Sequence, residues 1–384
     1  MQPITEEGVR WFEGLPHDDE YQHILEKRID EDLAPYTTQF AKPKDMFEGM
    51  QKIARTSKKF CRSSLIVKFG RKSATENTIT LEMPPAKPGD KTDNRRQMYQ
   101  RMILDLDVWC KRNQKPLPIV DFVIYVTDTY VWERYAHKYP WMIMAKPTNR
   151  KGILIPDNSF MSHDDKGGEY SMQGSFAQRI LRGPGHHAAG PAPVNLDGSK
   201  HLPPEPSYVW DRVKNKLAAH AVKDISDKEK VLFFKGANTG ADKYATRIHL
   251  SKFANETLPL QIDLEGSKQP MWSWAKKYVL LNLPGHQPWS YRRKYLYLLK
   301  SVVFHVNVHV EYTPDDVTGD WELFFDRLFV PGEDFVQLTQ YFYDDQHKMH
   351  KDGNPMKLGK LAADIAKAYG GACCLQLCVV SMQG

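Results

Sequence analysis

Short apolar runs alternate with helical segments along most of this 384-residue sequence, and this alternation constrains the fold more than any other feature. The clearest run, residues 119–126, consists almost entirely of Ile, Val, Phe and Tyr. It follows residues 95–113, where Met98, Met102 and Leu106 recur at the spacing of one helix face. A short buried strand after a helix is typical of a parallel sheet, so the sequence predicts an α/β fold.

The same alternation predicts elements in both halves of the chain. Strands are predicted at residues 64–69, 79–83, 118–127, 141–145, 153–160, 231–235, 277–283 and 301–306, and helices at residues 21–33, 45–60, 95–113, 208–221, 243–254, 290–299, 334–343 and 358–369. Residues 162–206 are rich in Gly, Pro, His and Asp, which is typical of a long functional or mobile loop. We place the domain boundary at its end, which gives an N-terminal unit of residues 1–205 and a C-terminal unit of residues 206–384, each with a parallel sheet.

The composition is that of a globular chain, with 41% hydrophobic and 26% charged residues. The formal net charge of +6 suits an anionic small substrate such as a nucleotide, and no motif indicates nucleic-acid binding. The basic pairs Lys58–Lys59 and Arg95–Arg96 are predicted to lie on solvated helix faces.

Cysteine usage indicates a reducing compartment. The five cysteines form no CxxC pair, zinc-ligand pattern or disulfide framework: Cys61, Cys110, Cys373, Cys374 and Cys378. Residues 1–15 are polar and acidic, unlike a signal peptide, and no apolar run is long enough to cross a bilayer. We therefore expect a cytoplasmic protein.

Candidate chemistry lies at the ends of predicted strands, where open α/β sheets bind their ligands. The first candidate is Asp128, directly after the strand at residues 118–127. A carboxylate there could act as a general base toward an acceptor hydroxyl. Asp is also a good helix N-cap, so a purely structural role stays open.

The second candidate is the turn after the strand at residues 231–235. Its small residues would let backbone amides approach a phosphate, and the following helix start would favour an anion: Lys235, Gly236, Ala237, Asn238, Thr239 and Gly240. Lys243 and Arg247 lie one turn apart on that helix. The turn lacks the Lys-Ser or Lys-Thr of a Walker A loop, so an ordinary strand–turn–helix connection is the alternative.

The third candidate follows the strand at residues 277–283. A hydroxyl, amide donors and a guanidinium group at a helix start would bind a pyrophosphate, and the segment supplies Pro288, Trp289, Ser290, Tyr291 and Arg292. The alternative is that Arg292 and Arg293 lie on a solvated helix face.

Metal binding is not predicted. His186–His187 and His163 with Asp164–Asp165 sit in the loop at residues 162–206 without fixed ligand spacing, so we interpret them as surface residues. Asp315–Asp316 is interpreted as part of a turn. The sequence contains no GxSxG motif, so a serine hydrolase is not indicated.

Taken together, five segments resemble glycosyltransferase family 90, which includes protein O-glucosyltransferases, related protein O-xylosyltransferases and fungal capsule xylosyltransferases. The resemblance covers most of the chain, in the family's order. It is carried by residues 118–128, 153–160, 231–240, 277–306 and 320–325.

The resemblance implies a GT-B architecture, in which two Rossmann-like domains face each other across a cleft, and an inverting reaction that needs no metal or cofactor. It implies that Asp128 is the general base and that Arg292 stabilises the departing diphosphate with help from Ser290. On the donor side it implies Lys235, Gly236, Ala237, Asn238, Thr239, Lys243, Arg247, Pro288, Trp289, Ser290, Tyr291 and Glu322. On the acceptor side it implies Pro156, Asp157, Ser159 and Phe160.

The sequence departs from the family pattern at Thr127 and Lys235, where the family usually has Arg, and at Asn238. These changes affect the expected sugar more than the use of UDP, so we expect UDP-xylose first and UDP-glucose second. Without a signal peptide, we expect a glycan or glycoside acceptor in a microbial or viral setting. The alternatives are a GT-B transferase with another nucleotide donor and a retaining outcome, or a catalytically silent sugar- or nucleotide-binding protein.

Overall fold

The fold is taken from a computed structural model, which describes most of two sheets and the helices around them. The described residues are 18–37, 43–73, 77–85, 91–112, 114–127, 131, 133–148, 150–157, 217, 219–222, 224–236, 246–254, 258–264, 271–284, 290, 292–309, 321–341 and 358–382. The predicted boundary at residue 205 lies outside them.

The first half contains a mixed five-stranded sheet. Its elements are α1 (Asp18–Thr37), α2 (Pro43–Thr56), β1 (Ser64–Arg71), β2 (Asn77–Glu82), α3 (Lys91–Arg112), β3 (Val120–Tyr125), α4 (Glu133–Ala136), β4 (Met142–Ile143), β5 (Ala145–Pro147) and β6 (Ile153–Leu154). The strand order is β2-β1-β3-β4-β6. Strands β3, β4 and β6 are parallel, but β1 is antiparallel to both β2 and β3. The prediction of a parallel sheet in this half is therefore wrong for β1 and β2.

The second half contains an all-parallel five-stranded sheet, as predicted. Its elements are β7 (Glu229–Lys235), α7 (Thr246–Leu250), β8 (Leu260–Asp263), β9 (Lys277–Asn282), α8 (Arg293–Tyr297), β10 (Val302–His309), β11 (Trp321–Leu323), β12 (Val336–Tyr341) and α9 (Leu358–Met382), with short 3-10 helices at Ile225–Asp227 (η4), Ser251–Phe253 (η5), Met271–Lys276 (η6) and Phe324–Leu328 (η7). The sheet has the order β12-β10-β9-β7-β8, with β11 outside it. The mixed α/β content agrees with the predicted fold class.

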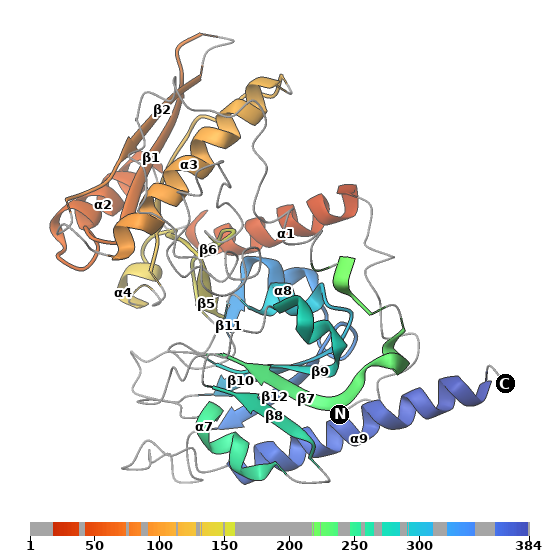
Figure 1. The fold of residues 1–384 in the computed structure, drawn as a ribbon. Coiled ribbons are helices and arrows are strands. Elements are labelled where there is room, and N and C mark those ends of the chain that lie inside the picture. The colour runs from red at the N-terminus through yellow and green to blue at the C-terminus, as the bar shows by residue number, and fades with distance from the viewer. Residues whose placement is uncertain are drawn as a thin grey trace.

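Side-chain alternation in these strands supplies two separate cores, because successive residues of a strand point to opposite faces. On one face, Phe234, Leu281 and Phe304 pack with Ile365 of α9. The other face belongs to a larger cluster, which includes Phe233, Leu280, Val303 and Phe335 of the sheet and Tyr295, Leu296 and Tyr297 of α8. The parallel sheet is thus covered on both faces, with α8 and α9 on opposite sides (Figure 1).

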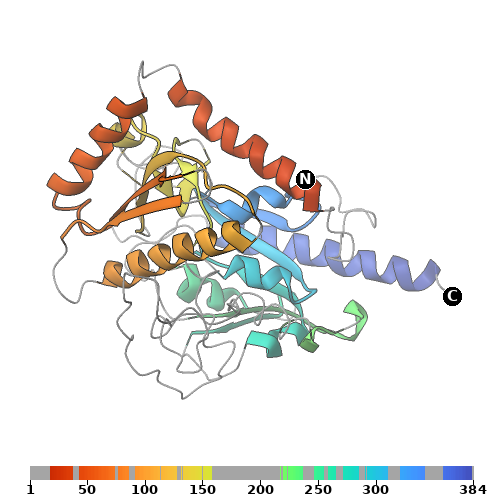
Figure 2. The same cartoon turned by 90° about the horizontal axis from the view of Figure 1, so that it is seen from above.

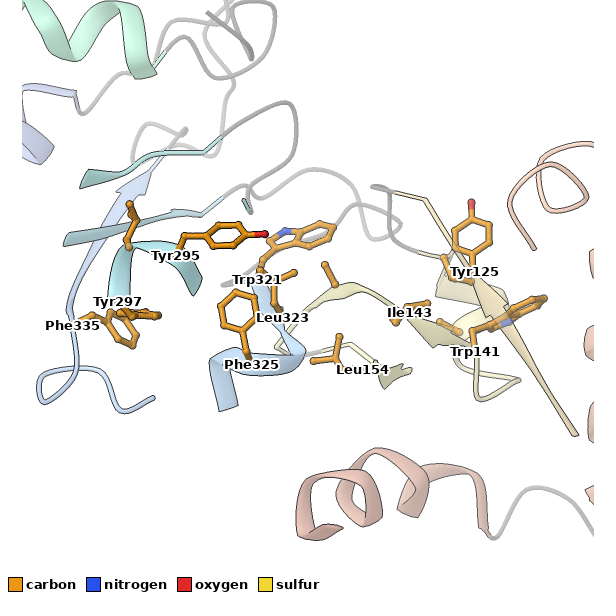
Figure 3. Packing of buried hydrophobic residues seen from close by; sticks show 14 of the residues in the cluster. Tyr125, Trp141, Ile143, Leu154, Tyr295, Tyr297, Trp321, Leu323, Phe325 and Phe335 are labelled. Carbon is orange, nitrogen blue, oxygen red and sulfur yellow. The ribbon is translucent and has the colours of Figure 1, made fainter. Parts of the chain in front are cut away.

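The larger cluster extends into the first half of the chain. Figure 3 shows Tyr125, Trp141 and Ile143 at one end of it and Tyr297 and Phe335 at the other, with Trp321 and Leu323 between them. Strand β11 also pairs antiparallel with β5, so that Glu322 lies opposite Lys146. One continuous core and one short ladder therefore join the two halves.

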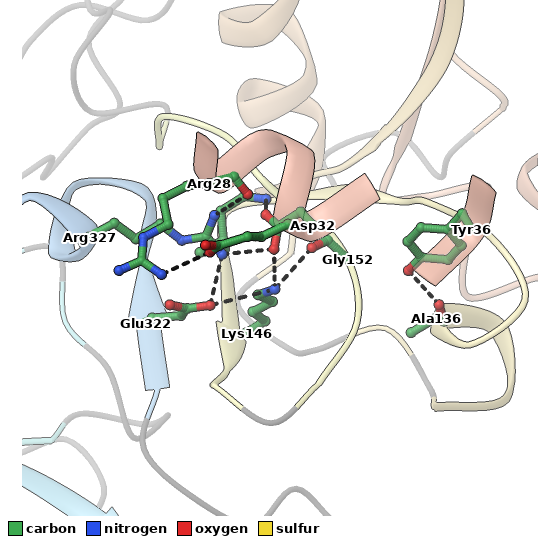
Figure 4. A network of polar contacts seen from close by, with 10 residues as sticks. Arg28, Asp32, Tyr36, Ala136, Lys146, Gly152, Glu322 and Arg327 are labelled. Carbon is green, nitrogen blue, oxygen red and sulfur yellow. Dashed lines mark hydrogen bonds and ion pairs between the residues drawn. The ribbon is translucent and has the colours of Figure 1, made fainter. Parts of the chain in front are cut away.

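A polar network reinforces this junction (Figure 4). Lys146 Nζ lies 2.6 Å from Asp32 Oδ1 of α1, and Arg327 Nη2 lies 2.8 Å from the same oxygen. Glu322 Oε1 accepts a hydrogen bond from Arg327 Nη2 at 2.9 Å and lies 3.5 Å from Lys146 Nζ. Each buried charge thus faces opposite charges, as buried charges require.

The short helix α8 makes two further buried ion pairs. Lys294 Nζ donates to Asp157 Oδ2 of the first half at 2.5 Å, and both side chains are at most 2% exposed. Arg293 Nη1 lies 3.2 Å from Asp326 Oδ2. Burial raises the pKa of Asp326 to about 6, although the charge of Arg293 acts to lower it. These contacts fix α8 between the two halves.

Several local predictions need correction. Residues 334–343 were predicted as a helix, but β12 lies there because Val336 and Leu338 alternate with polar neighbours and pack beside β10. The predicted helix at 290–299 is only five residues long in α8. Of the predicted helix at 243–254, residues 243–245 lie outside the described residues, and the rest forms α7 followed by the 3-10 helix η5. Arg96 was predicted on a solvated face but is 2% exposed and donates to the carbonyl oxygens of Cys61 and Pro84.

The C-terminal helix α9 continues past the sheet in both views (Figure 1 and Figure 2). Among the described residues, no helix combines the length and apolar character needed to cross a membrane.

The buried Lys294–Asp157 pair provides a test of the junction. We expect Lys294→Met to lower the free energy of unfolding by about 3–5 kcal/mol, because it leaves the Asp157 carboxylate buried without its ion partner. The double variant Lys294→Met/Asp157→Leu should cost much less than the sum of the two single changes. Urea unfolding of the four proteins measures this coupling.

The matched control is the exposed Arg55–Glu82 pair, at 2.6 Å, for which the same cycle should give a coupling below about 1 kcal/mol. If the Lys294–Asp157 coupling is no larger than this surface value, the pair does not join the halves as we describe.

Candidate anion site at the switch point of the parallel sheet

The winding of the parallel sheet reverses between β7 and β9. Numbered along the chain, its strands lie in the spatial order 2-1-3-4-5, so the first and third strands are neighbours and their outgoing connections diverge. Sheets of this order bind ligands in the crevice outside the carboxyl ends of these two strands. Two of the three predicted candidate segments follow β7 and β9, so the fold brings them to this place.

Strand β7 ends in Lys235, which is followed by Gly236. Lys235 Nζ lies 2.9 Å from Asp263 Oδ2 at the end of β8. The Gly236 N–H donates to the Asp263 carbonyl oxygen at 3.1 Å. Lys235, predicted to line the phosphate, therefore has a carboxylate partner within the fold, and its contribution to an anion site is reduced accordingly.

Two guanidinium groups converge on the ring of Phe234, the residue before Lys235. The Arg247 guanidinium of α7 lies 4.9 Å from the ring centroid, and that of Arg292 lies 4.7 Å from it. Arg247 Nη2 also donates to the carbonyl oxygen of Leu283, just beyond β9, at 3.4 Å. The predicted residues Arg247 and Arg292 are thus brought together at the switch point.

The electrostatics of this arginine pair favour an anion. Burial lowers the pKa of Arg292 to about 9, and the positive charge of Arg247 acts in the same direction. Burial also lowers the pKa of Arg247 to about 10. Both groups remain cationic at neutral pH, and a negative charge bound to them would offset the cost of burying two like charges. Because guanidinium groups bind phosphate oxygens in a bidentate manner, a phosphate group matches the site.

Gly236 is required by the position of Arg292. A Cβ atom at residue 236 would lie 2.6 Å from Arg292 Nη2 and 3.0 Å from Cζ of Phe234. The glycine therefore allows the guanidinium group to lie against the turn that follows β7. This is a close approach between two segments that are more than fifty residues apart in the sequence.

The contribution of the helix starts is smaller than predicted. Helix α8 has five residues, too few for a strong dipole, and the predicted helix start before α7 lies outside the described residues. Ser290 Oγ accepts a hydrogen bond from the Arg292 N–H at 3.3 Å, so this hydroxyl shapes the turn before α8. The alternative of a solvated face is wrong for both Arg292 and Arg293, since each is at most 8% exposed.

Three other predicted site residues lie at the junction of the halves. The Pro156 carbonyl oxygen accepts a hydrogen bond from Tyr99 Oη at 2.9 Å, and the Asp157 carboxylate is paired with Lys294. Glu322, predicted on the donor side, is engaged with Lys146 and Arg327. The contacts of Asp157 and Glu322 are structural ones between the two halves.

The remaining predicted residues lie outside the described residues. They are Asp128, Ser159, Phe160, Ala237, Asn238, Thr239, Lys243, Pro288, Trp289 and Tyr291, together with the whole loop at 162–206 and all the His and Asp residues considered for a metal. Within the described part of the chain, no three His, Cys, Asp or Glu side chains are grouped so that they could hold a metal ion. Metal independence stays a prediction.

Two polar residues that the sequence did not predict as part of a site, Asn282 and His305, lie side by side in β9 and β10. Both are almost fully buried, and Asn282 Nδ2 lies 2.7 Å from His305 Nδ1. The signal in the sequence was that each interrupts an apolar run near the end of a predicted strand, at residues 277–283 and 301–306.

Comparisons with known proteins assign no family to the chain: no protein-family profile matches it, and no curated protein does.

Gly236→Ala should separate the anion site from the stability of the fold. We expect the added methyl group to displace the guanidinium end of Arg292 and to weaken pyrophosphate binding by about tenfold, which corresponds to about 1.4 kcal/mol. The melting temperature should change little, because the displaced group is the end of a flexible side chain. Isothermal titration with pyrophosphate and thermal unfolding give the two readouts.

Gly370→Ala is the control, since a Cβ atom at this position of α9 meets nothing within 4 Å. It should bind pyrophosphate as the wild type does and gain up to about 1 kcal/mol of stability from helix propensity. Unchanged pyrophosphate affinity in Gly236→Ala would show that Arg292 does not bind the anion.

Proposed function

We propose that this chain is an inverting, metal-independent glycosyltransferase of GT-B architecture that moves xylose or glucose from a UDP-sugar to a hydroxyl group of a glycan or glycoside. The observation that carries the proposal is the buried pair Arg247 and Arg292 at the switch point of a parallel sheet. Doubly wound sheets bind nucleotides at this place, and two cations match the charge of a diphosphate. The resemblance of five segments to glycosyltransferase family 90 adds sugar transfer to nucleotide binding.

In the proposed reaction, Asp128 takes the proton of the acceptor hydroxyl group. The acceptor oxygen forms a bond to the anomeric carbon while the bond between that carbon and the diphosphate oxygen breaks. The bonding electron pair leaves with UDP, and Arg292 and Arg247 stabilise the negative charge that develops there. Attack opposite to the leaving group inverts the anomeric centre.

The first half supports the proposal less directly. Its sheet is mixed, because β1 is antiparallel to both neighbours, which departs from a Rossmann-like domain. Strands β3, β4 and β6 are parallel, so their carboxyl ends share one edge. Asp128 follows the end of β3 by three residues in the sequence. In our proposal this edge receives the acceptor.

UDP release from a panel of UDP-sugars, measured with EDTA and without acceptor, tests the function. We expect slow hydrolysis of UDP-xylose or UDP-glucose by the wild type. Arg292→Ala should lower the rate by about 10²–10³-fold, because it removes a group that stabilises the leaving diphosphate. Asp128→Asn should lower it by about 10²–10⁴-fold through the loss of the base that activates the attacking water.

Arg55→Ala is the matched control, because it removes the same charge from an exposed position in the first half and should leave hydrolysis unchanged. Binding of a UDP-sugar without turnover in any condition would favour the catalytically silent alternative. A wild type that neither hydrolyses nor binds any uridine nucleotide contradicts the proposal.

A further inference from the structure

A row of polar side chains crosses the parallel sheet, at the carboxyl ends of β7, β8 and β9, in the middle of β10 and near the start of β12. Asp263 pairs with Lys235, Asn282 pairs with His305, and His305 pairs with Gln337, each on the next strand. Phe233 lies opposite Leu280, and continuing this register by two residues places Lys235 beside Asn282. The strand alternation puts this row on the face that α8 covers.

The row marks a sharp change in the character of that face. Two residues earlier along β7, β9 and β10, and just before β12, the same face carries Phe233, Leu280, Val303 and Phe335, which belong to the apolar cluster. In β8 the corresponding residue is the exposed Gln261. Two residues later, Asn307 lies opposite Thr339, so the face stays polar to its edge. The face of the sheet that α8 covers is therefore mostly apolar toward the start of the strands and polar beside the switch point. We call this polar part, which includes Lys235, Asn282, His305 and Asn307, the polar floor.

Asn282 and His305 form the centre of this floor. Their side chains are hydrogen-bonded to each other at 2.7 Å, and they are 2% and 4% exposed. Burial holds the pKa of His305 well below its usual value, and the charge of Arg293 acts in the same direction, against the nearby Asn307 amide. The imidazole is thus neutral at physiological pH.

Each member of this pair has a further buried polar atom. Within the described part of the chain, Asn282 Oδ1 and His305 Nε2 have no hydrogen-bond partner of normal length and angle, although the Asn307 side chain interacts with the imidazole. If the amide donates to Nδ1, Oδ1 is an acceptor and Nε2–H is a donor. If the amide is turned over, the remaining amide nitrogen is a donor and Nε2 an acceptor. Either arrangement offers one donor and one acceptor.

We propose that Asn282 and His305 form a subsite for the sugar of the nucleotide donor, in which one sugar hydroxyl group both donates to and accepts from this pair. This inference rests on the proposed function. A hydroxyl group satisfies both atoms at once, whereas a phosphate oxygen has no proton to donate and would leave the acceptor unsatisfied. The neutral pair therefore complements the cationic site at Arg247 and Arg292, whose guanidinium groups lie over Phe234 on the other face of the same sheet.

Titration of UDP, UDP-xylose and UDP-glucose into Asn282→Leu, His305→Phe and the double variant tests the subsite. We expect the double variant to bind the UDP-sugar about tenfold more weakly, because it loses both hydrogen bonds to the sugar hydroxyl group. Its affinity for UDP should stay within about twofold of the wild type, a difference below 0.5 kcal/mol. Its melting temperature should hold or rise, because replacing two buried hydrogen-bonding groups with apolar groups of similar shape is close to neutral.

Gln261→Leu, an amide-to-leucine change at an exposed position of β8 in the same sheet, is the control and should change neither affinity. Equal weakening of UDP and UDP-sugar would assign the pair to the nucleotide and overturn the subsite, as would a lower melting temperature with unchanged UDP-sugar affinity. If the wild type binds UDP-sugar but the variants do not distinguish UDP-sugar from UDP, the subsite is overturned and the proposed function stays intact. A wild type that binds neither ligand overturns both.

Discussion

Three consecutive cations at the start of α8 are buried, and the arrangement of the two halves depends on how each one is accommodated. Arg292 lies against Phe234 and the turn after β7, Arg293 faces Asp326, and Lys294 is paired with Asp157 of the first half. Removing three positive charges from water is expensive unless each finds opposite charge or polar groups. The short helix is therefore held on three sides by elements that are distant in sequence.

This arrangement has a consequence for the site at the switch point. Arg293 and Lys294 fix the position of α8 through carboxylates, and Tyr297 accepts a hydrogen bond from Arg293 Nε at 2.7 Å. Arg292, the residue before α8, is consequently placed with little freedom against Gly236. A cation that is already in position does not have to reorganise when negative charge develops on a leaving group, and such preorganisation is the main source of electrostatic catalysis. The contacts between the halves and the proposed chemistry thus share one structural element.

Local sequence patterns predicted many of the helices and strands, but they could not predict how distant segments pair. The apolar runs at β9 and β10 were long and uniform enough to predict buried parallel strands. Residues 334–343 failed as a helix prediction because tertiary pairing with β10 decides between helix and strand there. The antiparallel direction of β1 also depends on its neighbours, since the sequence of a strand carries no direct record of its direction in the sheet.

In the candidate site, too, local patterns predicted some residues but could not predict contacts between distant segments. Arg247, Arg292 and Gly236 were predicted because each follows a strand of the sheet, and strand ends are places that the pattern identifies. Asp157 and Glu322 were assigned to a substrate cleft, yet their partners are Lys294, 137 residues away, and Lys146 and Arg327. Nothing in the local sequence separates a carboxylate that faces a ligand from one that joins two halves of a chain.

The polar floor shows why strand sequences still contain a functional signal. A sheet buried on both faces gains most stability from apolar residues, and the rows below the floor follow that rule. Asn282 and His305 are exceptions to this rule at paired positions of neighbouring strands, next to the point where the winding reverses. A buried polar pair that is only partly satisfied costs stability, and such departures from local consistency concentrate at functional sites. Their position near the switch point, rather than their residue types alone, is what connects them to a ligand.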